Sequence, residues 1–119
     1  MKKILIVEDV AMNRDLMVQL LEELYTIVEA VDGLEGLRLA EQEHPDLILS
    51  DLSLPGIDGW TLIARLRAMD SHREVPIIAV TAHAMVGDER RAVEAGCNDY
   101  LTKPVDEDLL LKKIRHWIG

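Results

Sequence analysis

The sequence predicts a doubly wound α/β domain, in which helices cover both faces of a parallel sheet. Apolar runs of strand length alternate with amphipathic helical segments five times along the 119 residues. Three runs are continuously apolar, as is typical of strands buried on both faces: residues 4–7, 47–49 and 77–80. Right-handed crossovers would then place helices on both sides of the sheet. The length suits one domain over residues 1–119.

The boundaries of the elements follow from turn residues and from hydrophobic spacing. Strands are expected at residues 3–7, 26–30, 46–50, 75–80 and 99–102. Helices are expected at residues 12–24, 33–44, 57–69, 84–95 and 106–118. Pro45 stops the second helix and Gly96 stops the fourth. Asp106 suits the N-cap of the last helix, and Asp58 suits a turn or capping position before Gly59.

The apolar positions also predict which helix faces are buried. The positions at helical spacing are Leu16, Leu20, Leu21 and Leu24 in the first helix, Leu34, Leu37 and Ala40 in the second, and Leu110, Ile114, Trp117 and Ile118 in the last. His44, His72 and His116 show no metal-ligand spacing and are expected in solvent. Cys97 is expected to be a small, semi-buried apolar residue in a turn rather than a nucleophile.

The bulk properties of the chain exclude several classes of partner. A net charge of −9 would repel nucleic-acid phosphate and anionic membrane surfaces. The apolar start stops at Glu8-Asp9, which is too short for a signal peptide, and no run approaches membrane-spanning length. A single cysteine excludes a disulfide framework. The protein is therefore expected in the cytoplasm, with no nucleic acid and no membrane among its partners.

Residues that carry chemistry follow four of the five predicted strands. They are Glu8 and Asp9 after the first strand, Asp51 after the third, Thr81 after the fourth and Lys103 after the fifth. All strands of a parallel sheet end at one edge, where ligands bind near the switch in strand order. These residues, which are far apart in sequence, are therefore expected to meet as three carboxylates, one hydroxyl and one ammonium.

The charge of this group predicts a bound cation. Two carboxylates about 5 Å apart repel by about 3 kcal/mol at an effective dielectric constant of about 20, and three of them raise one another's pKa values. Lys103 supplies one positive charge, and a hard divalent cation would supply the rest. Mg²⁺ suits a shallow site that also binds phosphate. A carboxylate beside such a cation can attack phosphorus and form an aspartyl phosphate.

The chain resembles the receiver domain of two-component response regulators along essentially its whole length. The matching residues are Glu8-Asp9 after the first strand, Asp51 in SDLSLPGIDG, Thr81-Ala82 after IIAV, and Tyr100, Lys103 and Pro104 in DYLTKP. Each motif alone is weak, but in this order, each at the end of the right strand, the set is highly specific. The resemblance implies a CheY-like, flavodoxin-like (βα)5 fold with strand order 2-1-3-4-5. It also implies a cis peptide bond between Lys103 and Pro104.

The resemblance assigns the phosphoryl-accepting site residue by residue. Asp51 would take a phosphoryl group from the phosphohistidine of a sensor histidine kinase or a histidine phosphotransfer protein. Glu8, Asp9 and Asp51 would hold Mg²⁺, with the backbone carbonyl of Ser53 as a further ligand. The protein would take part in its own phosphorylation and dephosphorylation, and would not be a turnover enzyme on an external substrate.

The resemblance also implies how the phosphoryl group is held and read out. Lys103 would pair with the phosphoryl oxygens, and Thr81 would hydrogen-bond to the phosphoryl group. Tyr100 would swing inward when Thr81 moves. A downstream target protein would bind the face formed by the fourth helix, the fifth strand and the fifth helix, including Ala84 and Met85. The protein would be a monomer or a weak, phosphorylation-linked dimer.

Some positions bear on the phosphoryl lifetime and on the type of receiver. Ser53 and His83 each lie two residues after a site residue, at positions that tune the phosphoryl lifetime in this family. Asn13 and Arg14 in EDVAMNRDL resemble the first helix of receivers from hybrid kinases and of single-domain cell-cycle regulators. Val10 departs from that pattern, which often has asparagine there. The start Met1-Lys2-Lys3 favours a single-domain regulator over a receiver cut from a longer protein.

Taken singly, the site residues have plainer interpretations. An acidic pair is favoured at any helix start, aspartate is common in turns, and threonine is an ordinary strand-end residue. A lysine before proline is typical of a solvated loop, and a lone tyrosine of a half-buried strand. The joint placement of Glu8, Asp9, Asp51, Thr81, Tyr100 and Lys103 favours the site over these interpretations.

Three other functions fit the fold class but not the residues. A flavodoxin-like electron carrier needs a loop rich in Ser, Thr and Gly after the first strand, but residues 8–11 begin with two acids that would repel a phosphate. A haloacid-dehalogenase-type phosphatase needs a second acid two residues after its nucleophile, where Ser53 stands. A purely structural pseudo-receiver, acting as a binding module, would have lost one of the acids or Lys103.

Overall fold

The computed structural model describes residues 1–82 and 87–119. Within these residues, five parallel strands form one sheet in the order β2-β1-β3-β4-β5. The strands are β1 Lys3–Val7, β2 Thr26–Ala30, β3 Leu47–Asp51, β4 Ile77–Thr81 and β5 Asp99–Thr102. The helices are α1 Ala11–Leu21, α2 Gly33–Glu43, α3 Gly59–Ala68, α4 Asp88–Ala95 and α5 Glu107–Ile118, with a short 3-10 helix, η1, at Asp70–His72. The predicted fold class and strand order are confirmed.

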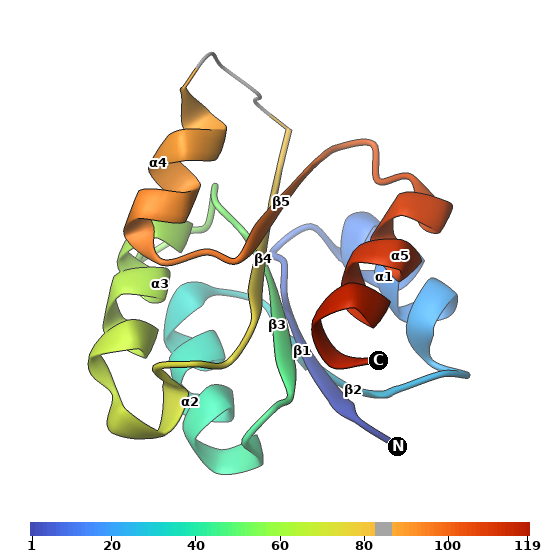
Figure 1. Cartoon of the computed structure of the whole chain (residues 1–119), viewed down its shortest axis with the longest axis horizontal. Coiled ribbons are helices and arrows are strands. Elements are labelled where there is room, and N and C mark those ends of the chain that lie inside the picture. The colour runs from blue at the N-terminus through green and yellow to red at the C-terminus, as the bar shows by residue number, and fades with distance from the viewer. Residues whose placement is uncertain (83–86) are drawn as a thin grey trace.

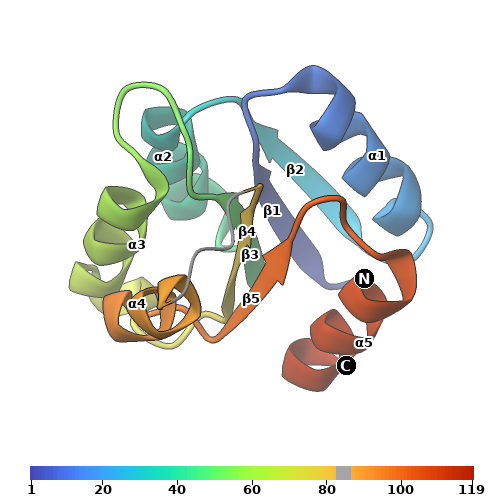
Figure 2. The same cartoon turned by 90° about the horizontal axis from the view of Figure 1, so that it is seen from above.

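The sheet lies between two layers of helices (Figure 1). α1 and α5 lie on one face, whereas α2, α3 and α4 lie on the other, as the view from above shows (Figure 2). Met17 and Leu110 belong to the apolar layer under α1 and α5, and Leu62 and Ala92 belong to the layer under the other three helices. β3 and β4 are buried along their whole length, because both faces are covered. The predicted site residues are therefore expected where the strands end, along the carboxyl edge of the sheet.

Aspartate side chains cap three of the helices. Asp32, Asp58 and Asp106 each accept a hydrogen bond from a backbone amide three residues later, at 2.8–3.0 Å. Such caps each stabilise a helix by about 1 kcal/mol. The expected roles of Asp58 and Asp106 are confirmed. Gly96 follows α4 with a φ of 117°, a left-handed conformation that favours glycine.

Three leucines expected in the core lie in solvent. Leu34 is 59% exposed, because the buried stripe of α2 runs through Gly33, Gly36 and Ala40 and turns the neighbouring position outward. Leu16 is 55% exposed, because α1 buries Met17 and Leu21 instead. Leu24 is 45% exposed, since α1 ends at Leu21 and the buried aromatic ring of Tyr25 follows directly.

The expectation of a solvated His72 was wrong, because η1 turns its ring inward. The side chain is only 2% exposed. Its Nε2 lies 2.7 Å from the Ala40 carbonyl oxygen, and its Nδ1 lies 2.7 Å from the Ser71 hydroxyl. A neutral imidazole satisfies both contacts by donating one hydrogen bond and accepting the other. His44 and His116 are exposed, as predicted.

Two strand ends differ from the prediction in a way that matters for the site. Asp51 and Thr81 are the last residues of β3 and β4 rather than the first residues after them. Pairing extends that far, because Asp51 lies opposite Val80 and Thr81 lies opposite Thr102. Both side chains are therefore fixed by the sheet. Of the predicted helix at residues 84–95, residues 84–86 lie outside the described part of the chain.

Cys97 packs in the apolar layer beside α3 and α4. Burial raises the pKa of its thiol to about 12, so it stays protonated and behaves as an apolar side chain, as expected. None of the helices within residues 1–82 and 87–119 combines the length and the apolar character needed to span a bilayer.

Candidate functional site

The carboxyl ends of β1, β3 and β5 bring the predicted acids and the lysine together. Oxygen atoms of Glu8, Asp9 and Asp51 all lie within 4.8 Å of one another. Glu8 is fully buried and Asp51 is 6% exposed, whereas Asp9 is exposed. Such a group of carboxylate oxygens has the ligand chemistry that a hard divalent cation prefers.

Lys103 lies between two of these acids. Its ammonium group donates a hydrogen bond to Glu8 Oε1 at 2.5 Å and another to Asp51 Oδ2 at 3.0 Å. Its backbone amide donates to the Thr81 carbonyl oxygen at 2.7 Å, which ties the loop after β5 to the end of β4. The Lys103–Pro104 peptide bond is cis, as predicted.

The remaining oxygen of Glu8 sets this site apart. Among the described residues, Glu8 Oε2 is buried and has no hydrogen-bond partner. A buried polar atom in that state costs roughly 1–3 kcal/mol, unless a ligand or a proton satisfies it. The orphaned oxygen is therefore evidence that this edge of the sheet is built to hold something.

The pKa values show how the site balances its charges in the absence of a cation. Burial raises the pKa of Glu8 to about 7, and the neighbouring Asp51 adds to this rise, while Lys103 opposes it. Burial alone would lower the pKa of Lys103, but its hydrogen bonds to Glu8 and Asp51 reverse the sign and raise it. Three carboxylates and one ammonium leave two negative charges uncompensated when all are ionised. A divalent cation would supply that missing charge.

The loop after β3 fixes the direction of the Asp51 carboxylate. The Ser53 amide donates to Asp51 Oδ1 at 3.0 Å, and the Leu52 amide donates to the Val80 carbonyl. The Gly59 amide, at the start of α3, donates to the Leu52 carbonyl at 3.0 Å. A Cβ atom at position 59 would lie 2.4 Å from the Asp51 carbonyl oxygen and 2.5 Å from Leu52 Cα. Only glycine permits α3 to start this close to the Asp51 backbone.

The two predicted switch residues lie on neighbouring strands. Thr81 ends β4 and is 3% exposed. Tyr100 on β5 is half-buried, packs against the layer that contains α3 and α4, and has a buried hydroxyl oxygen. The register pairs Ala79 with Tyr100, so the two side chains are two residues apart along the β4–β5 ladder. His83, Ala84 and Met85 lie outside the described residues.

Asp99 anchors α5 to the strand that carries Tyr100. Its carboxylate accepts hydrogen bonds from Lys113 at 2.5 Å and from the Trp117 indole at 3.1 Å. Burial alone would raise its pKa, but these donors and the Tyr100 amide outweigh burial and lower it. No sequence pattern links Asp99 to α5, because Asp99 lies on a strand and Lys113 and Trp117 on a helix, so no single helix or strand period connects them.

The sequence prediction missed a contact made by Arg14. Its Nη1 donates to the Glu8 carbonyl oxygen at 2.9 Å, and its Nε donates to Glu29 Oε1 at 3.2 Å. Arg14 was noted only as part of a resemblance, because a side chain that bonds a backbone carbonyl leaves no periodic signal in the sequence. The guanidinium therefore touches the same peptide segment that carries the acidic pair.

The strand order and the acidic, lysine-containing edge together define a CheY-like α/β domain. Comparison with known proteins narrows this class. Residues 4–115 match the model of the response regulator receiver domain family. The chain therefore belongs to that family, and is a receiver domain of the two-component response regulator type.

Individual relatives agree with this assignment. The chain is 40% identical to the polar-differentiation response regulator DivK of Brucella abortus (strain 2308) over 119 residues, covering 99% of this chain and 97% of that protein. The crystal structure of the receiver domain of sensor histidine kinase PA1611 from Pseudomonas aeruginosa PAO1, with a magnesium ion coordinated in its active-site cleft, has a TM-score of 0.91 and 39% identity, covering 99% and 98%. A chain from the co-crystal structure of the Saccharomyces cerevisiae histidine phosphotransfer protein Ypd1 and the receiver domain of Ssk1 has a TM-score of 0.88 and 33% identity, covering 98% and 88%.

Proposed function

We propose that this receiver accepts a phosphoryl group from a phosphohistidine onto Asp51, in a reaction that needs Mg²⁺. The observation that carries the proposal is the position of Asp51. It ends a fully buried strand, and it lies within reach of two further carboxylates and of the Lys103 ammonium. A purely structural aspartate at this position would gain nothing from the acidic neighbours that repel it.

The residues present fit a magnesium ion. Glu8, Asp9 and Asp51 offer oxygen atoms at one point, and the orphaned Glu8 Oε2 is free to accept a ligand bond or a water bridge. The backbone carbonyl of Ser53 is proposed as a further ligand by resemblance to other receiver domains. When bound, the ion would neutralise the carboxylates and the charge on the transferred phosphoryl oxygens. The magnesium ion in the PA1611 receiver supports this choice of metal.

The chain's own residues supply the remaining parts of the reaction. An Asp51 carboxylate oxygen attacks phosphorus and forms the O–P bond, while the N–P bond of the phosphohistidine breaks and its electron pair returns to the imidazole nitrogen. The Ser53 amide holds the other carboxylate oxygen and so fixes the line of attack. Lys103 contacts Asp51 and can pair with an oxygen of the phosphoryl group attached there, and Thr81 offers a hydroxyl at the end of the adjacent strand. Positioned charges of this kind account for most catalysis of phosphoryl transfer.

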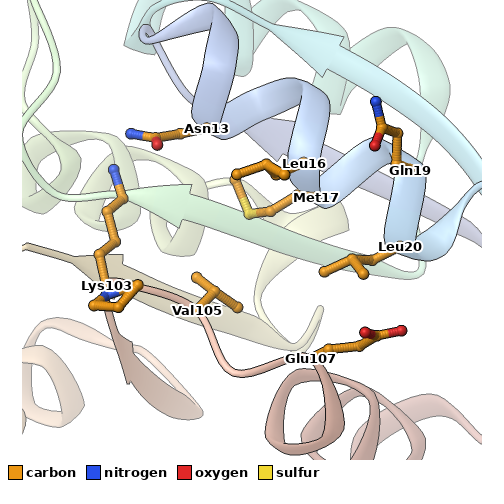
Figure 3. A pocket seen from close by; sticks show the side chains of 9 residues that line it. Asn13, Leu16, Met17, Gln19, Leu20, Lys103, Val105 and Glu107 are labelled. Carbon is orange, nitrogen blue, oxygen red and sulfur yellow. The ribbon is translucent and has the colours of Figure 1, made fainter.

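A groove beside the site suits the phosphodonor. It encloses about 310 Å³ between α1 and the segment from Lys103 to Glu107. Figure 3 shows Asn13 and Lys103 at one end of it, with Leu16 and Val105 along its walls. An exposed apolar groove that ends at the phosphoryl-binding lysine can bind a helix of a histidine kinase or a histidine phosphotransfer protein. The Ypd1 co-crystal supports a partner of that kind.

The protein is proposed to act as a switch and not as a turnover enzyme. In each cycle Asp51 is phosphorylated, and water then hydrolyses the aspartyl phosphate, which restores the carboxylate and releases only inorganic phosphate. A cytoplasmic location and a monomer or weak phosphorylation-linked dimer remain predictions that follow from this role.

The nucleophile is tested by mapping the phosphoryl group. Wild type, Asp51→Asn and Asp70→Asn should be treated with acetyl phosphate and Mg²⁺, trapped chemically and analysed by mass spectrometry. Asp70 is the matched control, because its side chain is 90% exposed and lies in η1, away from the site. Wild type and Asp70→Asn should carry one phosphoryl group at Asp51, and Asp51→Asn should carry none. Labelling of another residue, or full labelling of Asp51→Asn, would reject the assignment.

The output face is proposed to comprise α4, β5 and α5, coupled to the site through Thr81 and Tyr100. A phosphoryl group that contacts Thr81 biases a two-state packing by those contacts alone. Nuclear magnetic resonance spectra with beryllofluoride as a phosphoryl mimic should be compared for wild type, Thr81→Ala and Thr26→Ala, where Thr26 is an exposed residue of β2. Resonances of Tyr100 and of α4 should shift in wild type and Thr26→Ala but much less in Thr81→Ala. Equal shifts in all three proteins would show that the coupling avoids Thr81.

A further inference from the structure

The loop that joins β1 to α1 carries two of the three acids but has no capping side chain. α2, α3 and α5 each start at a capping aspartate, whereas α1 starts after Val10, whose side chain forms no cap. The direction of the Glu8–Asp9 segment must therefore be set by other contacts. It matters more than that of most loops, because a small rotation of this segment moves two carboxylates relative to Asp51.

The backbone of Glu8 is held from both sides. Its amide donates to the Ala30 carbonyl oxygen at 3.0 Å, at the end of β2. Its carbonyl oxygen accepts from Arg14 Nη1 at 2.9 Å, one turn into α1. Arg14 is in turn held by an ion pair with Glu29 at 3.2 Å, and only 16% of its side chain is exposed. The guanidinium thus connects the acidic loop to the first helix and to the second strand.

We propose that Arg14 is a positioning residue for the cation site. By fixing the Glu8 carbonyl, it sets the angle at which the Glu8 and Asp9 carboxylates face Asp51, without touching the cation or the phosphoryl group itself. This inference rests on the proposed function, because it concerns the Mg²⁺ that the function requires. Groups that orient metal ligands without binding the metal typically contribute about tenfold or more to affinity.

The charge of Arg14 allows this role to be separated from a simple electrostatic effect. A positive charge near a cation site weakens cation binding by electrostatic repulsion. If Arg14 acts through this repulsion alone, its removal should tighten Mg²⁺ binding. If the hydrogen bond to Glu8 matters, its removal should weaken binding despite the lost repulsion. Lysine keeps the charge but cannot reproduce the forked contact with the Glu8 carbonyl and Glu29.

The test compares Mg²⁺ affinity in wild type, Arg14→Lys, Arg14→Met and Arg38→Lys. Arg38 is the matched control, because it is an exposed arginine of α2 paired with Glu35. Affinity should be measured by following backbone amide resonances of the loop during a Mg²⁺ titration, and urea unfolding should be measured on the same samples without Mg²⁺. Both Arg14 variants should bind Mg²⁺ about tenfold more weakly. Arg38→Lys should bind it as wild type does.

Phosphorylation by acetyl phosphate gives a second readout. At a Mg²⁺ concentration well above the dissociation constant of each variant, the Arg14→Lys rate should return to within about twofold of the wild-type rate, since its lesion lies in metal affinity. Unchanged affinity in Arg14→Lys, or tighter binding in Arg14→Met, overturns the inference. A wild type that binds Mg²⁺ but never labels Asp51 rejects the proposed function instead, so the two failures are distinguishable.

Discussion

The two ends of the sheet both bury polar side chains, but they satisfy them to different degrees. At the amino end, the guanidinium of Arg67 donates five hydrogen bonds, to the carbonyl oxygens of His72, Arg73, Val75 and Gly96 and to Asn98 Oδ1. The buried imidazole of His72 has a partner at each nitrogen. At the carboxyl end, two buried acids share one lysine, and Glu8 Oε2 has no partner among the described residues.

This difference indicates that the amino end of the sheet has a structural role and the carboxyl end a functional one. A fully satisfied polar network fixes one conformation of the chain, whereas a partly satisfied one stores unfavourable free energy that a ligand can release. The Arg67 network therefore holds η1, β4 and β5 in place. The acids at the carboxyl end of the sheet keep negative charge that a bound cation would neutralise. Four changes test this contrast, and they are taken in order of decreasing effect on stability.

Replacement of Arg67 should cost the most stability. Arg67→Met removes five hydrogen bonds and leaves half-buried carbonyl oxygens without a donor, so the free energy of unfolding should fall by roughly 3 kcal/mol. Urea unfolding measures this loss. Arg73→Met is the control, because its ion pair with Asp70 is exposed, and it should change stability by less than about 0.5 kcal/mol. If Arg67→Met cost no more than the control, the amino-end network would not be structural.

Replacement of Glu8 should have the opposite sign. In the presence of a chelator at pH 8, Glu8→Gln should be more stable than wild type by about 2 kcal/mol, because it removes a buried charge whose pKa is raised. The folded wild type binds this proton up to about pH 7, whereas a free carboxyl loses it near 4.5. The folded state therefore holds more protons between these values, and wild-type stability should rise as the pH falls from 8 to 5. This prediction would be contradicted if Glu8→Gln were less stable than wild type at pH 8. It would also be contradicted if the difference in unfolding free energy between the two proteins widened as the pH falls.

Magnesium binding should relieve the electrostatic repulsion among the same acids. At about ten times its dissociation constant, Mg²⁺ should raise the free energy of unfolding of wild type by about 1.4 kcal/mol. Asp9→Asn at the same Mg²⁺ concentration should gain less than half of that, since one of three acidic ligands is lost. Thermal unfolding with and without Mg²⁺ measures both gains. Equal gains in the two proteins would place the ion elsewhere.

Replacement of Asp99 should have the smallest effect. Asp99→Asn weakens the contacts with Lys113 and Trp117, and should cost about 1 kcal/mol near neutral pH. The folded-state pKa of Asp99 is lowered from its ordinary value of 3.8, so this contribution is present in full above that pH and is lost as the pH falls through the folded-state pKa. Unfolding curves recorded from pH 7 down to acidic pH measure the difference in stability between wild type and Asp99→Asn. This difference should disappear only below about pH 4. A gap that closes near neutral pH would assign the effect to another group.

The sequence predicted the carboxyl end of the sheet better than the amino end. Asp51, Thr81 and Lys103 were identifiable because parallel strands end at one edge, so the residue that follows each apolar run can be placed from the sequence alone. Asp51 and Thr81 lie one residue further inside the sheet than predicted, because pairing to Val80 and Thr102 extends β3 and β4, whereas Lys103 follows β5 as predicted. The number of strands followed from the same alternation, whereas their order in the sheet was inferred from the resemblance to receiver domains.

The contacts of Arg67, His72 and Arg14 could not be predicted in this way. Each of these side chains bonds backbone carbonyls, which every residue carries, so no partner residue marks the contact. The exposed Leu34 shows a related limit. Helical spacing defines several adjacent stripes, and the buried one was decided by where Gly33 and Gly36 pack closely against Ile57 and Val7.

The close approach of Gly59 to the Asp51 backbone has a consequence for how such a switch fails. A methyl group at this position would overlap the Asp51 carbonyl and Leu52 Cα, so Gly59→Ala must shift the acceptor while leaving every charged residue and the groove beside α1 in place. We expect such a chain to bind its phosphodonor normally but to accept the phosphoryl group poorly. Under the proposed function, this variant would occupy the phosphodonor in a cell and compete with intact copies for it. A single uncharged substitution could thus be dominant over the wild-type allele.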